Sequence, residues 1–287
     1  MSPNGPGEPM RRFDERTILI TGATDGLGRR VAEDLAAAGA AILLHGRNPE
    51  KGRAALAEIR SATGSERLRY LNGDFSSLDA VRRLADEVAA EHPRIDVLVN
   101  NAGLGAGPRT EVRETSADGW ELRFAVNYLA PFLLTRRLLP LLRRAAAECG
   151  EARIVNVASA AQQAIDFDDP MLEKNYDGMR AYSQSKLALV MFTFDLAAEL
   201  GGSGVTVNAL HPASLMDTKM VREWFGKPRT SVGEGARALE RLVLSTEVEG
   251  VSGGYFEGIR QGRADAQAYD PEARRRLREM SMRWTGD

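Results

Sequence analysis

The sequence predicts an α/β fold, a doubly wound parallel sheet that forms a single domain. Two observations lead to this prediction. Short apolar runs alternate with amphipathic stretches along most of the 287 residues, and a glycine-rich turn, TGATDGLG (21–28), follows the first apolar run. Apolar strands that are each followed by a helix are typical of parallel sheets covered on both faces. Right-handed crossovers then wind the chain around the two faces.

Each element follows from its own stretch of sequence. The apolar runs that we expect to form strands lie at 17–21, 40–45, 67–72, 95–100, 153–159 and 205–211. The stretches that we expect to form helices lie at 27–38, 49–64, 78–91, 117–147 and 180–200. Gly39 closes the first helix and Pro49 opens the second, as these residue types often do. Pro140 predicts a bend or a local irregularity in the long fourth helix.

The two ends and one internal segment depart from this alternation. Residues 1–12 are rich in Pro and Gly, so we expect a disordered tail there, and Met10 is an alternative start. No linker divides residues 13–287, which predicts one domain. Residues 212–232 mix turn residues with Met and aromatic side chains. A long irregular segment of this kind predicts a substrate lid, with a packed surface loop as the alternative.

Composition narrows the class of partner. Apolar residues make up 43% and charged residues 27%, with a net charge of -2, so we expect neither nucleic acid nor an anionic membrane as partner. No apolar run reaches the ~20 residues that a membrane-spanning helix needs. Three histidines and the single Cys149 show no metal-ligand spacing, so we expect no metal. A lone cysteine fits a reducing compartment, and we expect a cytoplasmic location.

The glycine-rich turn predicts a nucleotide site between the first strand and the first helix. Glycine permits a tight turn and lets the backbone approach a ligand closely. The amino terminus of the following helix offers free N–H groups and a positive dipole end to a pyrophosphate. We expect the following residues of the turn to bind the cofactor: Gly22, Thr24, Asp25, Gly26, Leu27 and Gly28.

Arg47 indicates which cofactor is bound. It lies at the end of the second strand, where an acidic residue would bind a ribose 2′-hydroxyl and a guanidinium suits a 2′-phosphate. We therefore expect NADP(H) rather than NAD(H), with Asn48 beside Arg47 in the same site. Asp25 would repel that phosphate if it lay close, so the preference is expected to be moderate.

Two further strand ends complete the cofactor site. Asp74 and Phe75 follow the third strand, where Asp74 either binds the adenine amino group or caps the helix that begins at residue 78. Asn101, Ala102 and Gly103, in NNAG (100–103), follow the fourth strand. We expect their backbone to run close to the cofactor, with a simple turn as the alternative.

Tyr182 and Lys186, in YSQSK (182–186), predict acid–base chemistry. Four residues apart, they share one face of a helix. An ammonium ~4 Å from the phenol, at an effective dielectric of ~20, interacts by ~4 kcal/mol. That interaction lowers the tyrosine pKa by up to ~3 units before desolvation opposes it. Tyr182 is then a competent acid or base near neutral pH.

Ser159 and Asn127 extend this group. Ser159 ends the fifth strand, at the rim where ligands bind in such sheets, and its hydroxyl is suited to hold a substrate oxygen beside Tyr182. Asn127 lies inside the long helix. It either positions a water that connects Lys186 to solvent or is an ordinary helix residue.

Together, TGATDGLG, NNAG, Asn127, Ser159 and YSQSK resemble the short-chain dehydrogenase/reductase family over about 17–260. The resemblance implies a Rossmann-type fold and a catalytic tetrad of Asn127, Ser159, Tyr182 and Lys186. It also implies that the lysine binds the nicotinamide ribose. AYSQSKLALVMFTFDLAAEL followed by VTVNALHP is similar to the retinol-dehydrogenase-like branch. That similarity implies an NADP(H) preference and an apolar carbonyl or alcohol substrate.

One position departs from the family pattern. Ala213 follows His211 and Pro212, where the family usually has glycine. The resemblance implies cofactor contacts by Pro212 and by Thr218, the latter with the nicotinamide amide, but the departure leaves the course of this loop open.

The expected function is hydride transfer between nicotinamide and an apolar carbonyl or alcohol, as in a ketoreductase. The substrate pocket is expected between residues 160–170, the segment 212–232 and the carboxyl-terminal stretch. A homodimer through the helices at 117–147 and 180–200 is a further expectation. The alternatives are an NADPH-binding sensor without turnover, a methyltransferase, and an NADP-dependent epimerase or dehydratase.

Overall fold

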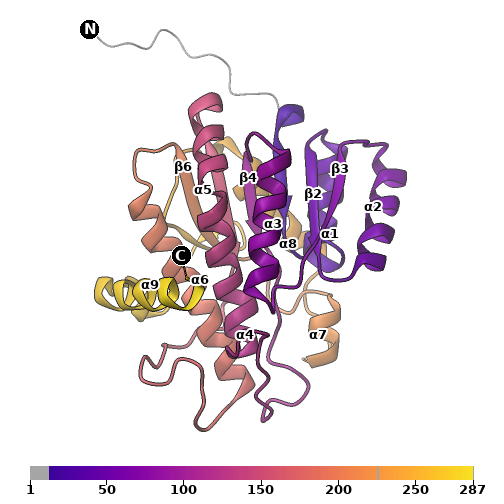
Figure 1. Cartoon of the computed structure of the whole chain (residues 1–287). Helices are drawn as coiled ribbons and strands as arrows, with labels where there is room; N and C mark the ends of the chain where they lie inside the picture. Colours follow the sequence, from indigo (N-terminus) through magenta and orange to yellow (C-terminus); the bar gives the residue numbers. More distant parts are fainter. Residues whose placement is uncertain (1–12, 225, 287) are drawn as a thin grey trace, which may run out of the picture.

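A mixed sheet forms the centre of the molecule in the computed structural model, which describes residues 13–224 and 226–286 (Figure 1). The tail expected at 1–12 lies outside the described residues. The sheet has the order β3-β2-β1-β4-β5-β6-β7-β8, and its strands are parallel except for β8, which is antiparallel to β7. The strands are β1 (Thr17–Ile20), β2 (Ala41–Gly46), β3 (Leu68–Asn72), β4 (Val97–Asn100), β5 (Ala152–Val157), β6 (Val205–His211), β7 (Tyr255–Glu257) and β8 (Arg260–Gln261). The doubly wound fold expected from the sequence is confirmed.

Helices cover both faces of the sheet. On one face lie α1 (Gly26–Ala37), α2 (Pro49–Thr63) and α8 (Val232–Leu244). On the other lie α3 (Leu78–Glu91), α5 (Ala130–Cys149) and α6 (Gly178–Glu199). Buried apolar side chains form one core cluster on each face. Among the residues that the structure describes, no helix is both long and apolar enough to cross a membrane.

The strand order creates the place where a ligand can bind. After β3 the chain crosses to the far side of β1, so β4 pairs with β1 rather than with β3. The connections at the carboxyl ends of β1 and β4 therefore leave in opposite directions. In doubly wound sheets, ligands bind at this switch point.

The long helix expected at 117–147 is shorter at its start and more irregular. It begins with α4 (Leu122–Phe124), passes through a π-helical turn, η2 (Ala125–Leu129), and continues as α5 to Cys149. The segment before it turns at Gly119, and Thr115 pairs with Glu121. α5 continues through Pro140 without interruption, and the irregularity that the structure shows lies upstream, at the π turn.

The carboxyl-terminal third contains elements that the sequence reading missed. They include α8, β7, β8, the 3-10 turn η4 (Ala266–Tyr269) and α9 (Pro271–Thr285). Within the segment 212–232, the six residues Lys219–Trp224 form α7. Short 3-10 turns occur at η1 (Phe13–Glu15) and η3 (Thr246–Val248).

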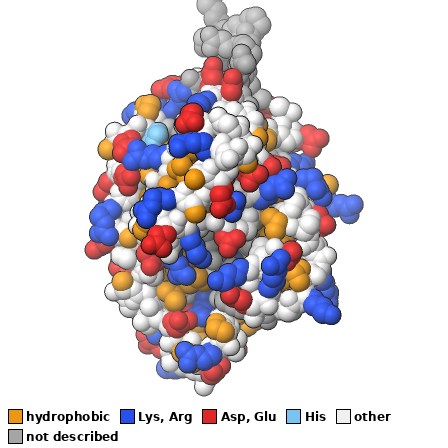
Figure 2. Space-filling view, turned by 90° about the vertical axis from the view of Figure 1, so that its right-hand side faces the viewer, with side chains coloured by type: hydrophobic (Ala, Val, Ile, Leu, Met, Phe, Trp, Pro, Cys, Tyr) orange, Lys and Arg blue, Asp and Glu red, His pale blue; other side chains and the backbone are white. Residues whose placement is uncertain are grey.

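The last helix, α9, lies across α6 (Figure 1). Arg278 on α9 donates two hydrogen bonds of 2.8 Å to the carboxylate of Asp195 on α6. The buried hydroxyls of Ser281 and Tyr128 are 2.6 Å apart. The chain's end is therefore integrated into the helical layer that also carries the Tyr182 and Lys186 pair. On the face shown in Figure 2, side chains of both charge signs are interspersed.

Gly52 makes a close contact between α2 and β3. A Cβ atom on Gly52 would overlap the ring of Tyr70. That ring is held in place, because the Tyr70 hydroxyl lies 2.7 Å from the carbonyl oxygen of Gly46 and 2.9 Å from that of Asn48. The glycine is therefore required by packing, although glycine lowers helix propensity.

We expect Gly52→Ala to destabilise the protein. Alanine gains ~1 kcal/mol in helix propensity, but overpacking costs ~1–3 kcal/mol and the tyrosine cannot move away freely. The matched control is Gly233→Ala in α8, where the nearest atom to the new Cβ is 3.7 Å away. Urea unfolding should show a lower free energy of unfolding for the first variant and an equal or higher one for the second. Equal stabilities for both variants would contradict this account of the contact.

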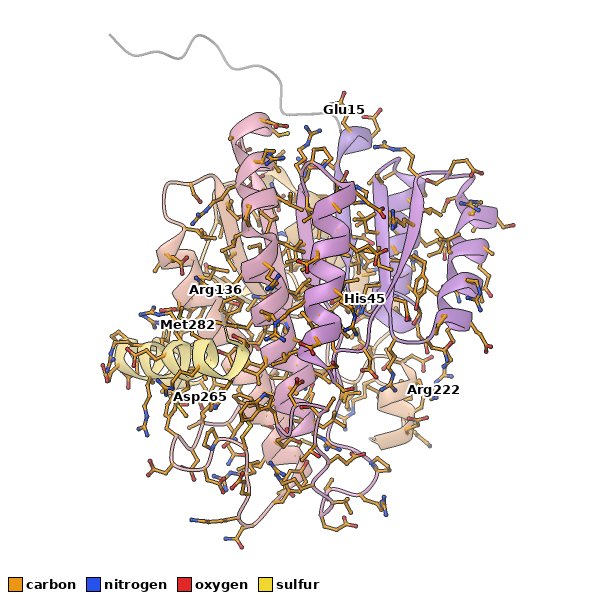
Figure 3. All side chains as sticks on the ribbon, viewed as in Figure 1. Glu15, His45, Arg136, Arg222, Asp265 and Met282 are labelled. Atoms are coloured by element: carbon orange, nitrogen blue, oxygen red, sulfur yellow. The ribbon has the colours of Figure 1, made fainter. Side chains whose placement is uncertain are left out.

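His45 connects three strand ends inside the protein (Figure 3). It is 2% exposed, its Nε2 lies 2.9 Å from the carbonyl oxygen of Gly73, and its Nδ1 accepts a hydrogen bond of 3.4 Å from the Gly22 backbone N–H. The ring stacks on Phe75 at 4.2 Å. Burial lowers the pKa of His45 from 6.5 to about 4. Nδ1 must be unprotonated to accept from Gly22, so the neutral ring is the form that fits the fold.

We expect His45 to make the protein less stable in mild acid. The unfolded chain binds a proton below pH ~6.5, whereas the folded protein does so only below about 4. The stabilisation that neutral His45 provides is therefore fully present above pH ~6.5 and is lost as the pH falls toward about 4. The free energy of unfolding decreases by up to ~3 kcal/mol over this range. Urea unfolding of the parent and of His45→Gln between pH 7 and 4 should show the steeper loss in the parent. Parallel profiles would show that the histidine is not the titrating group.

Candidate active site

A groove of about 720 Å³ runs along the carboxyl ends of the strands. Most of the predicted site residues line it: Gly22, Thr24, Asp25, Gly26, Leu27, Gly28, Arg47, Asp74, Phe75, Asn101, Ala102, Gly103, Ser159, Tyr182, Lys186, Pro212 and Thr218. Asn48 and Asn127 lie outside this lining. Residues from seven separate segments are thus brought to one edge of the sheet, as the parallel topology requires.

The glycine turn packs directly against the turn that follows β4. Gly22 has a φ of 65°, and a Cβ atom on it would lie 2.8 Å from the Cα of Ala102. A Cβ on Gly28 would overlap the side-chain amide of Asn101. That amide donates hydrogen bonds to the carbonyl oxygens of Thr21 (2.8 Å) and Gly22 (3.0 Å). Asn101 therefore braces the glycine turn, which is a role additional to the expected backbone contact.

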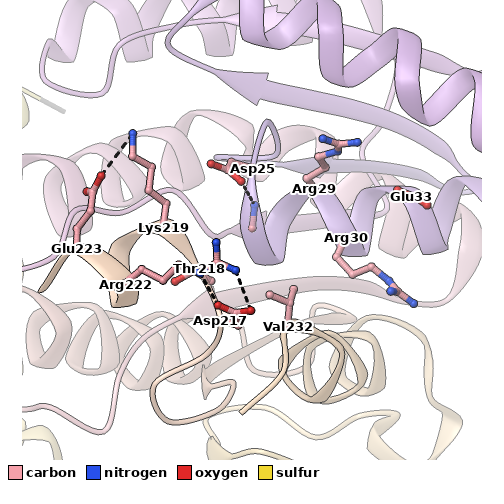
Figure 4. Close-up of a pocket in the computed structure, with 11 residues that line it drawn as sticks. Asp25, Arg29, Arg30, Glu33, Asp217, Thr218, Lys219, Arg222, Glu223 and Val232 are labelled. Carbon is pink, nitrogen blue, oxygen red and sulfur yellow. Dashed lines mark hydrogen bonds and ion pairs between the residues drawn. The ribbon is translucent and has the colours of Figure 1, made fainter. Parts of the chain in front are cut away.

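Asp25 and Thr218 meet at the amino end of α1 (Figure 4). Asp25 caps the helix, because its exposed carboxylate accepts a hydrogen bond of 2.7 Å from the Gly26 N–H. Thr218 lies on the other side of Gly26, and its Cγ2 would be 3.5 Å from a Cβ there. Its hydroxyl accepts from the Val221 N–H at 3.3 Å. Thr218 therefore faces the glycine turn. The resemblance to the family implied a contact with the nicotinamide amide instead.

A side cavity opens beside this corner, between α1 and α7 (Figure 4). Two exposed ion pairs lie within α7 or at its start. Arg222 donates hydrogen bonds of 2.6 and 2.9 Å to Asp217, and Lys219 lies 3.6 Å from Glu223. The start of the segment 212–232 thus forms one wall of the groove, while its residue 225 lies outside the description.

The end of the groove beside α2 carries two cationic side chains. Arg47 is exposed and follows β2, and Lys51 lines the groove from the first turn of α2. The side chain of Asn48 caps the amino end of α2, because its Oδ1 accepts from the N–H groups of Glu50 (3.0 Å) and Lys51 (2.9 Å). The sequence reading missed Lys51, although a lysine one helical turn after a strand-end arginine was a usable signal.

Asp74 does not cap α3. Its Oδ1 accepts from the Ser76 N–H at 2.9 Å and closes a short turn. Ser77 caps the helix instead, by accepting from the Ala80 N–H at 3.4 Å. The helix-cap alternative was therefore wrong, and the carboxylate of Asp74 stands in the groove lining.

Tyr182 and Lys186 lie one turn apart on α6. Lys186 is buried, and its Nζ donates a hydrogen bond of 2.8 Å to the carbonyl oxygen of Val157. The Nζ is 5.9 Å from the centre of the Tyr182 ring. Burial lowers the pKa of Lys186 to about 8. Burial raises the pKa of Tyr182, and a hydrogen bond with Ser159 offsets part of that rise. The sequence argument expected the ammonium to lower this pKa, but desolvation prevails in the structure.

Ser159 follows the end of β5 and is almost fully buried. Its hydroxyl oxygen accepts a hydrogen bond of 3.0 Å from the Ala161 N–H and stands beside the Tyr182 phenol. A phenol and a hydroxyl that lie together in this way can both bind one substrate oxygen.

Asn127 lies in the π-helical turn and is buried. Its amide pairs with the backbone of Leu104, accepting at 2.7 Å and donating at 2.9 Å, and it also donates to the Ser185 hydroxyl at 2.9 Å. A Cβ on Gly103 would lie 3.2 Å from the Asn127 Oδ1 and 3.4 Å from the Lys186 Nζ. The side chain therefore joins η2, α6 and the turn after β4, rather than reaching into the groove.

Apolar side chains surround the Tyr182 end of the groove. They include Leu104, Leu122, Val126, Ala160 and Ala161, whereas Met216 lines the groove from the side of Leu27 and Gly235. His211 also lines it, and its Nε2 is 3.0 Å from the Ser214 hydroxyl. Burial lowers the pKa of His211. The sequence reading did not place His211 in the site, although its position at the end of β6 pointed there.

Known proteins share this arrangement. A profile of the family described as short chain dehydrogenase matches residues 16–228. Mouse retinol dehydrogenase 13 is 39% identical over 288 residues, covering 94% of this chain and 84% of the relative. Mouse polyprenol dehydrogenase is 36% identical over 286 residues, with coverages of 94% and 84%.

Solved structures agree with the sequence relatives. A Mycobacterium paratuberculosis protein superposes with a TM-score of 0.78 at 29% identity, covering 97% of this chain and 96% of that one. A short chain dehydrogenase from Escherichia coli complexed with NADPH superposes with a TM-score of 0.67 at 28% identity, covering 85% and 96%.

The family profile spans the glycine turn, Ser159, Tyr182 and Lys186. The relatives cover almost the whole chain at identities well above those at which only a fold is shared. The chain therefore belongs to the short-chain dehydrogenase/reductase family, in its retinol-dehydrogenase-like branch, and is an NAD(P)-dependent oxidoreductase of CH–OH and C=O groups.

Proposed function

We propose that the protein interconverts an apolar alcohol and its aldehyde or ketone with NADP(H), using Tyr182 as the acid and base. The observation that carries the proposal is the grouping of Tyr182, Ser159 and Lys186 at the apolar end of a groove that begins at a glycine turn. The names of the relatives, retinol and polyprenol dehydrogenase, favour long apolar alcohols as the substrate class. A ketoreductase activity belongs to the same proposal.

The groove fits a dinucleotide. The glycine turn and the amino end of α1 suit the pyrophosphate, and Asp74 and Phe75, which line the groove, would flank the adenine. Arg47 and Lys51 would bind the 2′-phosphate, and Lys186 the nicotinamide ribose. Asp25, whose carboxylate caps the amino end of α1, would weaken this preference if it lay close to the 2′-phosphate. The NADPH complex of the Escherichia coli relative supports this choice of cofactor.

The chain's own residues would handle the proton. When bound, NADP(H) supplies the two-electron hydride chemistry. The hydroxyls of Ser159 and Tyr182 would donate to the substrate oxygen and stabilise the charge that develops on it. A raised pKa keeps Tyr182 protonated at neutral pH, which suits it as the proton donor in the reductive direction. Lys186 stands between charged and neutral near physiological pH, because its pKa is about 8, and would help return the proton.

The remaining roles are proposals of the same kind. Asn127 would act by fixing the turn at Leu104 and the hydroxyl of Ser185, both beside the reacting groups. The segment 212–232 would act as a lid over the groove.

A cytoplasmic location and a homodimer remain predictions. Because α9 lies over α6, a dimer interface that includes α6 would include α9 as well, and light scattering would report the assembly.

A sensor without turnover is the second candidate. It would need the cofactor groove but not the phenol, hydroxyl and ammonium that meet at its apolar end. One sample of purified protein can separate the two functions, if NADPH binding and NADPH oxidation are both measured. Binding of NADPH without its oxidation by any apolar aldehyde, ketone or quinone would favour the sensor. Decanal and all-trans-retinal are suitable first probes.

We expect Tyr182→Phe to lower kcat for decanal reduction by ~100-fold or more, since general acid catalysis contributes that much. The dissociation constant for NADPH should stay within ~2-fold, because the phenol carries no charge there. Tyr176→Phe is the matched control: its hydroxyl donates to Glu121 at 3.0 Å and lies outside the groove. Activity of the Tyr182 variant within a few-fold of the parent would exclude it as the proton donor.

We expect Arg47→Leu to weaken NADPH binding by ~10–100-fold, as for loss of a charged hydrogen bond of ~1.5–3 kcal/mol. NADH binding should change little, because NADH lacks the 2′-phosphate. Arg53→Leu removes the same charge from the exposed face of α2, outside the groove, and serves as the control. Fluorescence titration with both cofactors measures the effect. Equal losses for NADPH and NADH would contradict a 2′-phosphate contact.

A further inference from the structure

The carbonyl oxygen of Ser159 is held by two side chains. The hydroxyl of Tyr255, on β7, donates to it at 3.1 Å in the buried interior. The amide of Gln162 donates to it at 2.9 Å. Tyr255 is 1% exposed and lies beyond the stretch that the family profile matches.

Gln162 links this carbonyl to the carboxyl-terminal segment. While its Nε2 donates to Ser159, its Oε1 accepts a hydrogen bond of 2.9 Å from the Asp265 N–H. One amide group thus connects the residue after β5 with the chain just before η4. Tyr255 and Asp265 come from the same third of the chain, so both supports depend on how that third is placed.

The loop that follows Ser159 is tied to the same segment at two more points. The side chain of Gln267 accepts from the Ile165 N–H at 2.6 Å and donates to the Ile165 carbonyl at 3.1 Å. Arg276 on α9 donates to the Phe167 carbonyl at 3.4 Å and lies 5.0 Å from the centre of its ring. Backbone groups of Ile165 and Phe167 are therefore bonded by residues about a hundred positions later.

Ser159 needs such support because strand pairing stops before it. The last ladder-like bond is from the Ala158 N–H to the Leu210 carbonyl at 2.8 Å. Beyond it, Tyr255 and Gln162 hold the carbonyl oxygen of Ser159, and the Ala161 N–H donates to its hydroxyl. Reacting groups must be held within about 0.5 Å of their working position, and a shift of ~1 Å can cost ~100-fold in rate.

We propose that Tyr255, together with Gln162, is a positioning residue that holds the Ser159 hydroxyl in register with the Tyr182 phenol. The proposal rests on the proposed function, because it assumes that Ser159 binds the substrate oxygen. Tyr255 acts only through Ser159 and touches neither substrate nor cofactor. The carboxyl-terminal segment is thereby part of the apparatus that aligns the catalytic group.

The test is a double-mutant cycle with decanal, followed by oxidation of NADPH at high enzyme concentration. Tyr255→Phe keeps the ring and removes the hydroxyl. We expect it to lower kcat by about tenfold, with KM and NADPH affinity within about twofold, because Ser159 is misaligned by a fraction of an ångström. In a Ser159→Ala background, the same substitution should change kcat by less than about twofold. A general loss of stability would lower activity equally in both backgrounds.

Two further variants sharpen the result. Gln162→Met removes the second donor to the same carbonyl and should give the same dependence on Ser159. Tyr269→Phe is the control in the same segment: its hydroxyl accepts from the Ala264 N–H at 3.0 Å and does not reach Ser159, so kcat should match the parent. Thermal unfolding of Tyr255→Phe should shift by only about 2–4 °C, as for one lost hydrogen bond.

Hydrogen exchange gives a readout that needs no turnover. In Tyr255→Phe the amides of residues 159–167 should exchange faster than in the parent, and in Tyr269→Phe they should not. Three results would overturn the positioning role. Exchange at residues 159–167 could be unchanged in Tyr255→Phe, this variant could leave kcat unchanged, or it could lower kcat equally in the parent and in Ser159→Ala. Parental activity in Ser159→Ala, or no turnover of any probe, would instead overturn the proposed function, and exchange alone would then decide whether Tyr255 holds the loop.

Discussion

The close approach of two strand-end turns is the constraint on which the site depends. The turn after β1 and the turn after β4 touch backbone to backbone, which only residues without a side chain at positions 22 and 28 allow. Asn101 then bridges the turns with hydrogen bonds to Thr21 and Gly22. This contact fixes the amino end of α1 against the floor of the groove. From there the parallel strands place every other site segment at the same edge.

Burial sets the chemistry at the far end of the groove. Removing Lys186 and Tyr182 from water disfavours their charged forms, which lowers the pKa of the lysine to about 8 and raises the pKa of the phenol. A charged partner such as an oxidised nicotinamide changes that balance when it arrives. Burial alone therefore favours the protonated phenol.

The sequence was sufficient for the sheet through β6, for most of its helices and for many of the residues that line the groove, because these carry strong periodic or spacing signals. It missed Lys51 and His211, which also line the groove. Three kinds of feature could not be obtained from it. The strands β7 and β8 are three and two residues long, too short to show a period. The π turn at Asn127 depends on packing around it rather than on local preference. The bond between Tyr255 and Ser159 joins residues 96 positions apart, and no local pattern records such a contact.

The tie between Ser159 and the carboxyl-terminal third has a consequence for how the protein is made. A ribosome releases the chain from its amino end, so the groove's lining is complete once Glu223 has emerged. Tyr255, Asp265 and Gln267 follow only later. A nascent chain at the intermediate stage would have the parts that hold a nucleotide but not those that align its serine. Cofactor capture and catalytic competence would then be acquired in sequence during translation.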